Sequence, residues 1–184
     1  MYNRRQFILW KRVPRPDGRV DKVPVDPVKL RTHDAHNPAI WMSHGDALER
    51  ATQLGLPYGV GFVFTADDPY WFIDVDNAAV DGAWKPIVAE IHALVPGVGI
   101  ELSQSGTGLH YIGCGEVPTD RVIKCREHDF DLYTDKRFVA LTQPVLNGNP
   151  DLDTTAGITA IVDRWEEHTS ELQSHSELGC RHPL

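Results

Sequence analysis

The sequence predicts an α+β fold with a mixed, largely antiparallel sheet. Three observations indicate this class. Short runs of aromatic and β-branched residues, which favour strands, recur along the chain. Two longer segments have the apolar spacing of helices. Tight turn sequences separate the later runs, as in antiparallel hairpins.

The first half of the chain is expected to alternate strands with one helix. The predicted strands are RQFILWKRV, YGVGFVF and the acid-bearing residues 70–75. The turn PRPDGRV follows the first strand, and the prolines of DKVPVDP favour an edge strand or a loop. HDAHNPAIW is loop-like. Ser43 is expected to cap a helix in SHGDALERATQLGL, whose apolar positions fit helical spacing.

The second half adds a second helix and the later strands. WKPIVAEIHALV is predicted to be helical and to end at Pro96-Gly97. GIELS and LHYIGCG are predicted strands on either side of a turn at residues 104–108. VIKCREHDFDLY leads into another strand, and TDK turns the chain into RFVALT. A closing helix is expected over residues 155–165.

Bulk properties limit the class of protein. The 184 residues suffice for one domain, or for two small modules that share a core. No apolar run approaches the ~20 residues of a membrane span, and the N-terminus lacks the cleavage site of a signal peptide. Three cysteines, an odd number without a framework, favour a reducing compartment, so the cytoplasm is the expected location.

Charge is unevenly distributed. The net charge is −8, yet residues 1–31 hold nine Lys and Arg against three Asp, whereas residues 32–165 hold eight basic and nineteen acidic side chains. This asymmetry allows a basic arm on one side and an acidic, metal-binding cleft on the other. A solvated pair of N-terminal strands is an equally good interpretation of the basic segment.

The last 19 residues are expected to lie outside the domain. EEHTSELQSHSELGCRHPL, residues 166–184, has no steady apolar periodicity, and its first part looks like a sequencing-library adapter translated in frame. We therefore predict a domain at residues 1–165 followed by a non-native read-through tail. The alternative is a genuine polar helix.

Paired acids are the first chemical signal. Asp74 and Asp76 alternate with core residues in FIDVDN, so both point to one face of their strand. Divalent cations such as Mg²⁺ relieve the repulsion of such a pair. Asp131 in FDLY is the predicted third acid, and Asp129 is the competing candidate. A strand-end turn or a surface charge pair is the alternative reading of the first two acids.

The run SGTGLH is the second signal. Gly106 and Gly108 allow close approach of a ligand, and successive N–H groups beside Ser105 can cradle an anion that His110 also contacts. An ordinary hairpin with a surface histidine is the alternative. The run is not a GxxxxGK[ST] phosphate loop. The cationic candidates for phosphate binding that follow are Lys124, Arg126 and Arg137. A strand-edge charge is an equally good interpretation of Lys124 and Arg126, and a weaker one of Arg137, which abuts the apolar FVAL.

Together, FIDVDN, SQSGTGLHYIG and FDLYTDKRFVALT resemble motifs of the archaeo-eukaryotic primase superfamily. The resemblance is nearest to the phage- and plasmid-type bifunctional primase-polymerase domains that precede a helicase. ILWKRVPRPDGRVDKVPVDP and GVGFVFTADDPYWFIDVDNA also look like this family. The similarity spans roughly residues 5–145. A departure is Asp131, where many relatives with this pattern carry Glu, which puts the metal preference in doubt.

The resemblance implies a template-dependent nucleotidyltransferase that joins nucleoside triphosphates on single-stranded DNA. It implies a two-part catalytic core, an N-terminal αβ unit and a unit related to the RNA-recognition motif. Two Mg²⁺ or Mn²⁺ ions would be bound by Asp74, Asp76 and Asp131, and the nucleotide by Ser105, Gly106, Gly108, His110 and Arg137. Template DNA would contact Arg12, Lys22, Lys124 and Arg126, and a helicase domain or protein would lie downstream. A metal-dependent nuclease or phosphodiesterase, or an inactive DNA-binding module, are the alternatives.

Overall fold

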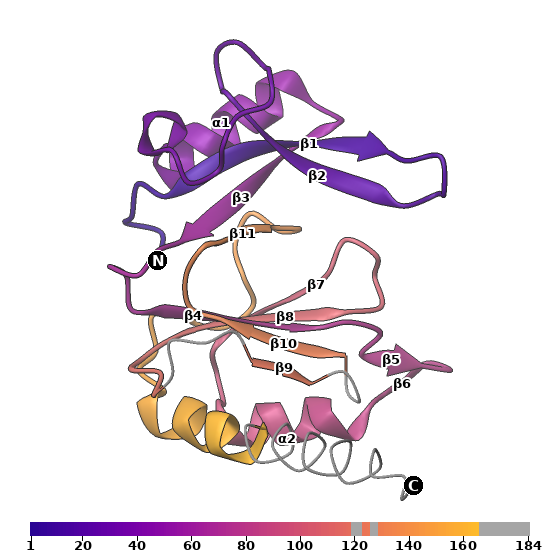
Figure 1. The fold of residues 1–184 in the computed structure, drawn as a ribbon, viewed down its shortest axis with the longest axis vertical. Coiled ribbons are helices and arrows are strands. Elements are labelled where there is room, and N and C mark those ends of the chain that lie inside the picture. Colours follow the sequence, from indigo (N-terminus) through magenta and orange to yellow (C-terminus); the bar gives the residue numbers. More distant parts are fainter. Residues whose placement is uncertain (119–122, 126–128, 166–184) are drawn as a thin grey trace, which may run out of the picture.

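Two antiparallel sheets organise the computed structural model, which describes residues 1–118, 123–125 and 129–165. The four-stranded sheet has the order β11-β3-β1-β2, with strands Arg137–Ala140, Tyr58–Phe64, Phe7–Pro14 and Val20–Val25. The five-stranded sheet has the order β7-β8-β4-β10-β9, with strands Gly99–Leu102, Leu109–Cys114, Tyr70–Val75, Phe130–Tyr133 and Ile123–Cys125. Figure 1 shows one sheet above the other. The predicted α+β class is confirmed.

The helices begin and end where local chemistry predicts. Helix α1, His44–Leu54, is capped by Ser43, whose hydroxyl accepts a hydrogen bond from Asp46 N at 3.1 Å. Gly55 ends it with a positive φ of 64°. Helix α2, Pro86–Leu94, starts with a proline, which is favoured at a first helical position. Before α1, a short 3₁₀ helix, Pro38–Ile40, interrupts the loop-like HDAHNPAIW.

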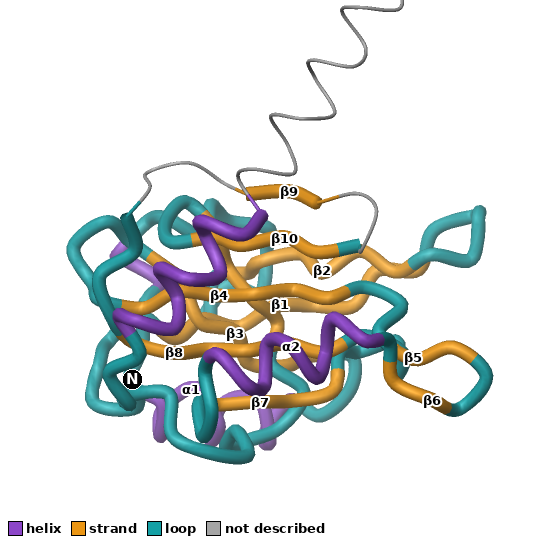
Figure 2. The backbone as a smooth tube through the Cα atoms, turned by 90° about the horizontal axis from the view of Figure 1, so that it is seen from below, coloured by secondary structure: helices purple, strands orange, loops and turns teal. Residues whose placement is uncertain are grey.

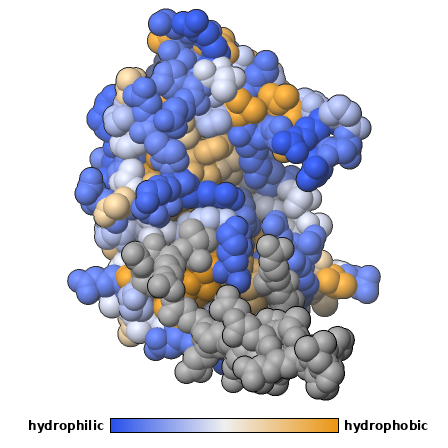
Figure 3. Space-filling model, viewed as in Figure 1, coloured by the Kyte–Doolittle hydropathy of each residue, from blue (hydrophilic) through white to orange (hydrophobic). Residues whose placement is uncertain are grey.

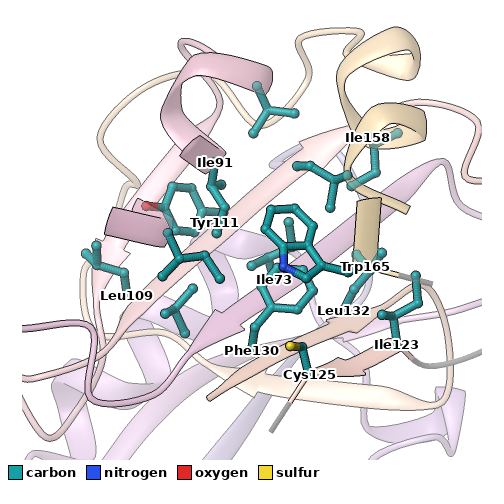
Figure 4. Close-up of a cluster of buried hydrophobic side chains, with 14 of the residues drawn as sticks. Ile73, Ile91, Leu109, Tyr111, Ile123, Cys125, Phe130, Leu132, Ile158 and Trp165 are labelled. Atoms are coloured by element: carbon teal, nitrogen blue, oxygen red, sulfur yellow. The ribbon is translucent and has the colours of Figure 1, made fainter. Parts of the chain in front are cut away.

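Each face of the five-stranded sheet is packed differently. Helix α2 and the helical residues 155–165 lie side by side on one face (Figure 2), which confirms the predicted closing helix. Side chains of β4, β8, β9 and β10 and of these helices fill the core between them. Figure 4 labels several of the strand residues, Ile73, Leu109, Tyr111, Phe130 and Leu132, and two residues of the closing helix, Ile158 and Trp165. The opposite face packs Tyr70 and Phe72 against Phe7 and Phe62 of the four-stranded sheet. This second face therefore lies between the two sheets.

Three features differ from the expected elements. A hairpin of β5, Ala79–Val80, and β6, Ala83–Trp84, follows the acid-bearing strand; its strands of two residues are too short for a period-2 signal. VIKCREHDFDLY forms two strands, β9 and β10, rather than one. The turn TDK does not close a hairpin, because β11 pairs with β3 in the other sheet.

The β5–β6 hairpin projects from the domain and exposes apolar side chains (Figures 1 and 3). Val80 and Trp84 are each 52% exposed. Among the described residues, no helix is both long and apolar enough to cross a bilayer. The predicted tail, residues 166–184, lies outside the described part of the chain, and so does Arg126.

Candidate active site

A row of ionisable side chains crosses the five-stranded sheet. Register places them opposite one another on successive strands, in the order Glu101, His110, Asp74, Asp131 and Lys124. Directly opposite residues of an antiparallel pair point to the same face. We call these five residues the polar row. The polar row lies on the face of the five-stranded sheet that is turned toward the four-stranded sheet. Along β4, its member Asp74 is two residues after Phe72, which packs in the apolar cluster between the sheets.

Asp74, at the centre of the polar row, is the most constrained acid. Its side chain is 18% exposed, and its Oδ1 atom is buried with no hydrogen-bond partner among the described residues. Burial raises the pKa of Asp74, and the charge of Asp76 raises it further. His110, Arg137 and Lys22 act in the opposite direction. An unpaired, desolvated carboxylate oxygen at this position would be stabilised by a cation.

Asp131, not Asp129, lies opposite Asp74. Its Oδ2 accepts a hydrogen bond from Tyr133 Oη at 2.6 Å, and Lys124 Nζ lies 3.4 Å away. Asp129 occupies the preceding turn with a positive φ of 53°, and its carboxylate binds Lys85 Nζ at 3.1 Å. The register therefore favours Asp131 as the acid that shares a site with Asp74.

Asp76 extends the acid group beyond the end of β4. It is exposed, and its backbone N–H donates to Asp129 O at 2.8 Å. Asp74 and Asp76 line the same cavity. Within the described parts of the chain, no three His, Cys, Asp or Glu side chains are grouped as the ligands of one metal ion. Asp131 is instead held by Tyr133 and Lys124, so the three-acid metal site stays a prediction.

The small-residue turn between β7 and β8 is tied together by its own groups. Gly106 N donates to Ser103 O at 2.9 Å, and Gly108 N to Ser103 Oγ at 3.1 Å. Ser105 Oγ lies 2.9 Å from Ser103 Oγ and 3.0 Å from Thr107 Oγ1. A Cβ at Gly108 would lie 2.8 Å from Ser103 Oγ, so this position requires glycine. These two amides therefore already donate within the turn, and the exposed Ser105 presents its hydroxyl beside them.

His110 is buried and held from one side. Its Nδ1 lies 2.8 Å from Glu101 Oε1, and its Nε2 lies 3.7 Å from Asp74 Oδ1. The ring packs edge-on against Phe72, with centroids 5.2 Å apart. The predicted nucleotide-binding histidine is therefore a direct neighbour of the predicted metal-binding Asp74.

Two cavities are lined by Asp74 and His110 of the polar row, whereas Asp131 lines neither of them. The Arg137 cavity, about 490 Å³, is also lined by His36 and Lys136. The Ser105 cavity, about 500 Å³, is lined by further residues that include Arg12, Arg19 and Asp76. Lys22, Asp74 and His110 line both cavities. The predicted nucleotide ligands Ser105 and Arg137 thus lie in separate cavities that meet at three shared side chains.

The predicted template residues are only partly together. Arg12 and Lys22 are direct partners on β1 and β2 and line the Ser105 cavity. Partial burial of the ammonium group in the cleft lowers the pKa of Lys22, although Asp74 opposes this. Lys124 lies at the far end of the polar row and lines neither cavity. Arg126 lies outside the described residues.

Comparison with known proteins bears on this arrangement. The chain is 27% identical, over 178 residues, to a protein of Nitratiruptor phage NrS-1 described as a DNA primase-polymerase. The predicted resemblance to a primase-polymerase is confirmed. The match covers 92% of this chain and 23% of the relative, so the chain spans less than a quarter of that primase-polymerase. No protein-family model matches the chain.

One member of the polar row was not expected from the sequence. Glu101 is 2% exposed and lies beside His110, but GIELS indicated only a strand. The available signal was a single acid among apolar neighbours, on the same face as Gly99. Its partner, nine residues further on, becomes evident only from the register of β7 with β8.

Proposed function

We propose that residues 1–165 form the catalytic domain of a DNA primase-polymerase, which joins nucleoside triphosphates on a single-stranded DNA template. One observation carries the proposal. Asp74 and Asp131 lie opposite each other on a sheet face onto which two cation-lined cavities open. The similarity to the phage primase-polymerase supports it independently.

The proposed architecture has two parts. The first is an N-terminal αβ unit, for which the four-stranded sheet and α1 are the natural components. The second is a unit related to the RNA-recognition motif, supported by an antiparallel sheet that carries its helices on one face and leaves the other for a ligand. The cavities between the sheets would then hold substrate.

Two Mg²⁺ or Mn²⁺ ions fit the available donors. Asp74, Asp76 and Asp131 offer only carboxylate oxygens, which these hard cations prefer, and Asp74 Oδ1 is buried without a hydrogen bond among the described residues. Bound ions would polarise the α-phosphate and stabilise the attacking and leaving oxygens. Asp131 would exchange its contacts with Tyr133 and Lys124 for this role.

The chain's own cations would bind the substrate. Arg137 and Lys22 of the four-stranded sheet would balance the negative charge of a triphosphate in the Arg137 cavity, and His110 would contact it from the five-stranded sheet. A primer 3′-hydroxyl, or the hydroxyl of a first nucleotide, would attack in line and pyrophosphate would leave. Arg12 and its basic neighbours would hold template phosphates, so template affinity would fall as salt rises.

The proposed partners are the template, nucleoside triphosphates and a downstream helicase domain or protein. The matched region accounts for less than a quarter of the phage relative, which leaves room in such a protein for further domains. The helicase itself is an expectation of the family resemblance.

Nucleotide incorporation tests the proposal. The full chain is incubated with a single-stranded template, with or without a primer, with labelled dNTPs or NTPs, and with Mg²⁺ or Mn²⁺. We expect labelled products, and a loss of about 100-fold or more for Asp74→Asn and for Asp131→Asn, since even indirect metal partners contribute about 10–100-fold. Asp67→Asn, an exposed acid just before the other end of β4, is the matched control.

Three outcomes would contradict the proposal. Shortening of the DNA without incorporation would indicate a nuclease. DNA binding without any nucleotide-dependent product would indicate a binding module. Full activity of Asp131→Asn with loss in Asp129→Asn would move the third acid to the competing position.

A further inference from the structure

Glu101 is a buried carboxylate with polar partners on both of its oxygens. Its side chain is inaccessible to solvent. Oε2 accepts hydrogen bonds from Thr142 N and Thr142 Oγ1, both at 2.8 Å, and from Gln143 N at 3.2 Å. Oε1 lies 2.8 Å from His110 Nδ1. A carboxylate group is an acceptor at both oxygens, and two backbone N–H groups and a hydroxyl converge on Oε2.

This environment determines which way His110 faces. Because Glu101 only accepts, Nδ1 of His110 must carry the hydrogen of their contact. Nε2 is then the ring atom directed at Asp74 and at the two cavities. Phe72 restricts rotation of the ring from a third side. The histidine is therefore oriented by Glu101, which lines neither cavity, and by Phe72, which lines the Arg137 cavity.

Glu101 is itself held by the chain segment that follows β11. Thr142 Oγ1 lies 2.7 Å from Leu102 O as well as 2.8 Å from Glu101 Oε2, and its single hydrogen serves one of these two acceptors at a time. The backbone N–H groups of Thr142 and Gln143 hold the Glu101 carboxylate in either case. Backbone donors from Thr142 and Gln143 cannot rotate as side chains do. The anchor is consequently rigid, as expected of a group that positions another.

We propose that Glu101 is a positioning residue for substrate binding, which fixes His110 with Nε2 toward the triphosphate. This inference rests on the proposed function. Glu101 touches neither substrate nor metal in this role and acts through His110. A purely structural role, in which Glu101 only stabilises the turn after β11, is the competing explanation.

The variant Glu101→Gln separates the two explanations. Thr142 and Gln143 need an acceptor, so the amide oxygen takes the Oε2 position and the amide NH₂ faces His110 Nδ1. Nδ1 then accepts a hydrogen bond from the amide, so the single hydrogen of a neutral ring moves to Nε2, the atom directed at Asp74. We expect kcat/KM for the incoming nucleotide to fall about 10–100-fold, as for other second-sphere partners. Glu90→Gln, at the remote Glu90–Arg164 ion pair, should stay within about twofold.

A double-mutant cycle with His110→Ala gives the decisive readout. If Glu101 acts through His110, Glu101→Gln causes no further loss in the His110→Ala background. An equal loss in both backgrounds, or no loss in either, overturns the proposal in favour of the structural role. Thermal melts of every variant show whether each remains folded at the assay temperature.

Histidine ¹⁵N NMR of the metal-free chain provides a second test that needs no activity. The His110 signals are assigned by their absence in His110→Ala. We expect a hydrogen on Nδ1 in the wild type and its loss in Glu101→Gln. A wild-type His110 with bare Nδ1 overturns the proposal even if Glu101→Gln does not fold. If the wild type incorporates no nucleotide, the proposed function fails. The spectrum still shows whether His110 Nδ1 carries the hydrogen of its contact with Glu101.

Discussion

Trp165→Ala should destabilise the domain strongly, because Trp165 closes the core beneath the five-stranded sheet. Its side chain is 1% exposed and stacks on Phe130, with centroids 5.0 Å apart and planes 22° from parallel (Figure 4). Truncation of a buried Trp costs about 3–5 kcal/mol, which includes the loss of this aromatic contact. For a domain of this size, each kcal/mol shifts Tm by about 2–4 °C, so Tm should fall by about 6–20 °C.

The measurement is a thermal melt followed by far-UV circular dichroism. Trp84→Ala is the matched control, since Trp84 is half exposed on the β5–β6 hairpin and its loss should shift Tm by less than about 3 °C. A chain truncated after Trp165 should have the same Tm as the full chain if the predicted domain boundary is correct. A Tm for Trp165→Ala within about 3 °C of Trp84→Ala would refute the placement of residues 155–165 in the core.

Two further predictions concern single polar groups. Tyr111 Oη is buried and has no hydrogen-bond partner among the described residues. Because Tyr111→Phe removes this buried polar group, it should raise Tm by at least about 2 °C in a thermal melt. A lower Tm than that of the wild type would indicate a partner for the hydroxyl. Burial raises the pKa of the Cys114 thiol, and Asp153 and Asp151 raise it further. At pH 8, Cys114 should therefore carry less thiolate and react more slowly with iodoacetamide than free glutathione does, with a rate that still rises above pH 9. Mass spectrometry of the Cys114 peptide measures this, and a rate above that of glutathione would contradict the prediction.

Local signals explain why most elements could be predicted. The cap at Ser43, the proline that begins α2 and the alternation in β4 each involve residues a few positions apart. The common face of Asp74 and Asp76 follows from the same alternation. Such features depend on backbone geometry within one element, which a single sequence contains.

Pairing between distant strands could not be predicted in the same way. Asp131 lies opposite Asp74 because β10 adopts one register on β4, and a slip of one residue would turn it to the other face. The contact between Glu101 and His110 also depends on register, since the two residues belong to different strands. The partner of β11 depends on tertiary packing, because its sequence suits a strand in either sheet.

The route of β11 has a consequence for how the chain is made. The edge of β3 that receives Arg137–Ala140 is synthesised long before that strand leaves the ribosome. Until then, β3 carries unpaired backbone groups that other nascent chains could join. The four-stranded sheet is thus completed only when nearly the whole domain has been translated. A fragment with only one of the two sheets would separate β11 from β3 and leave the backbone groups of that strand edge unpaired.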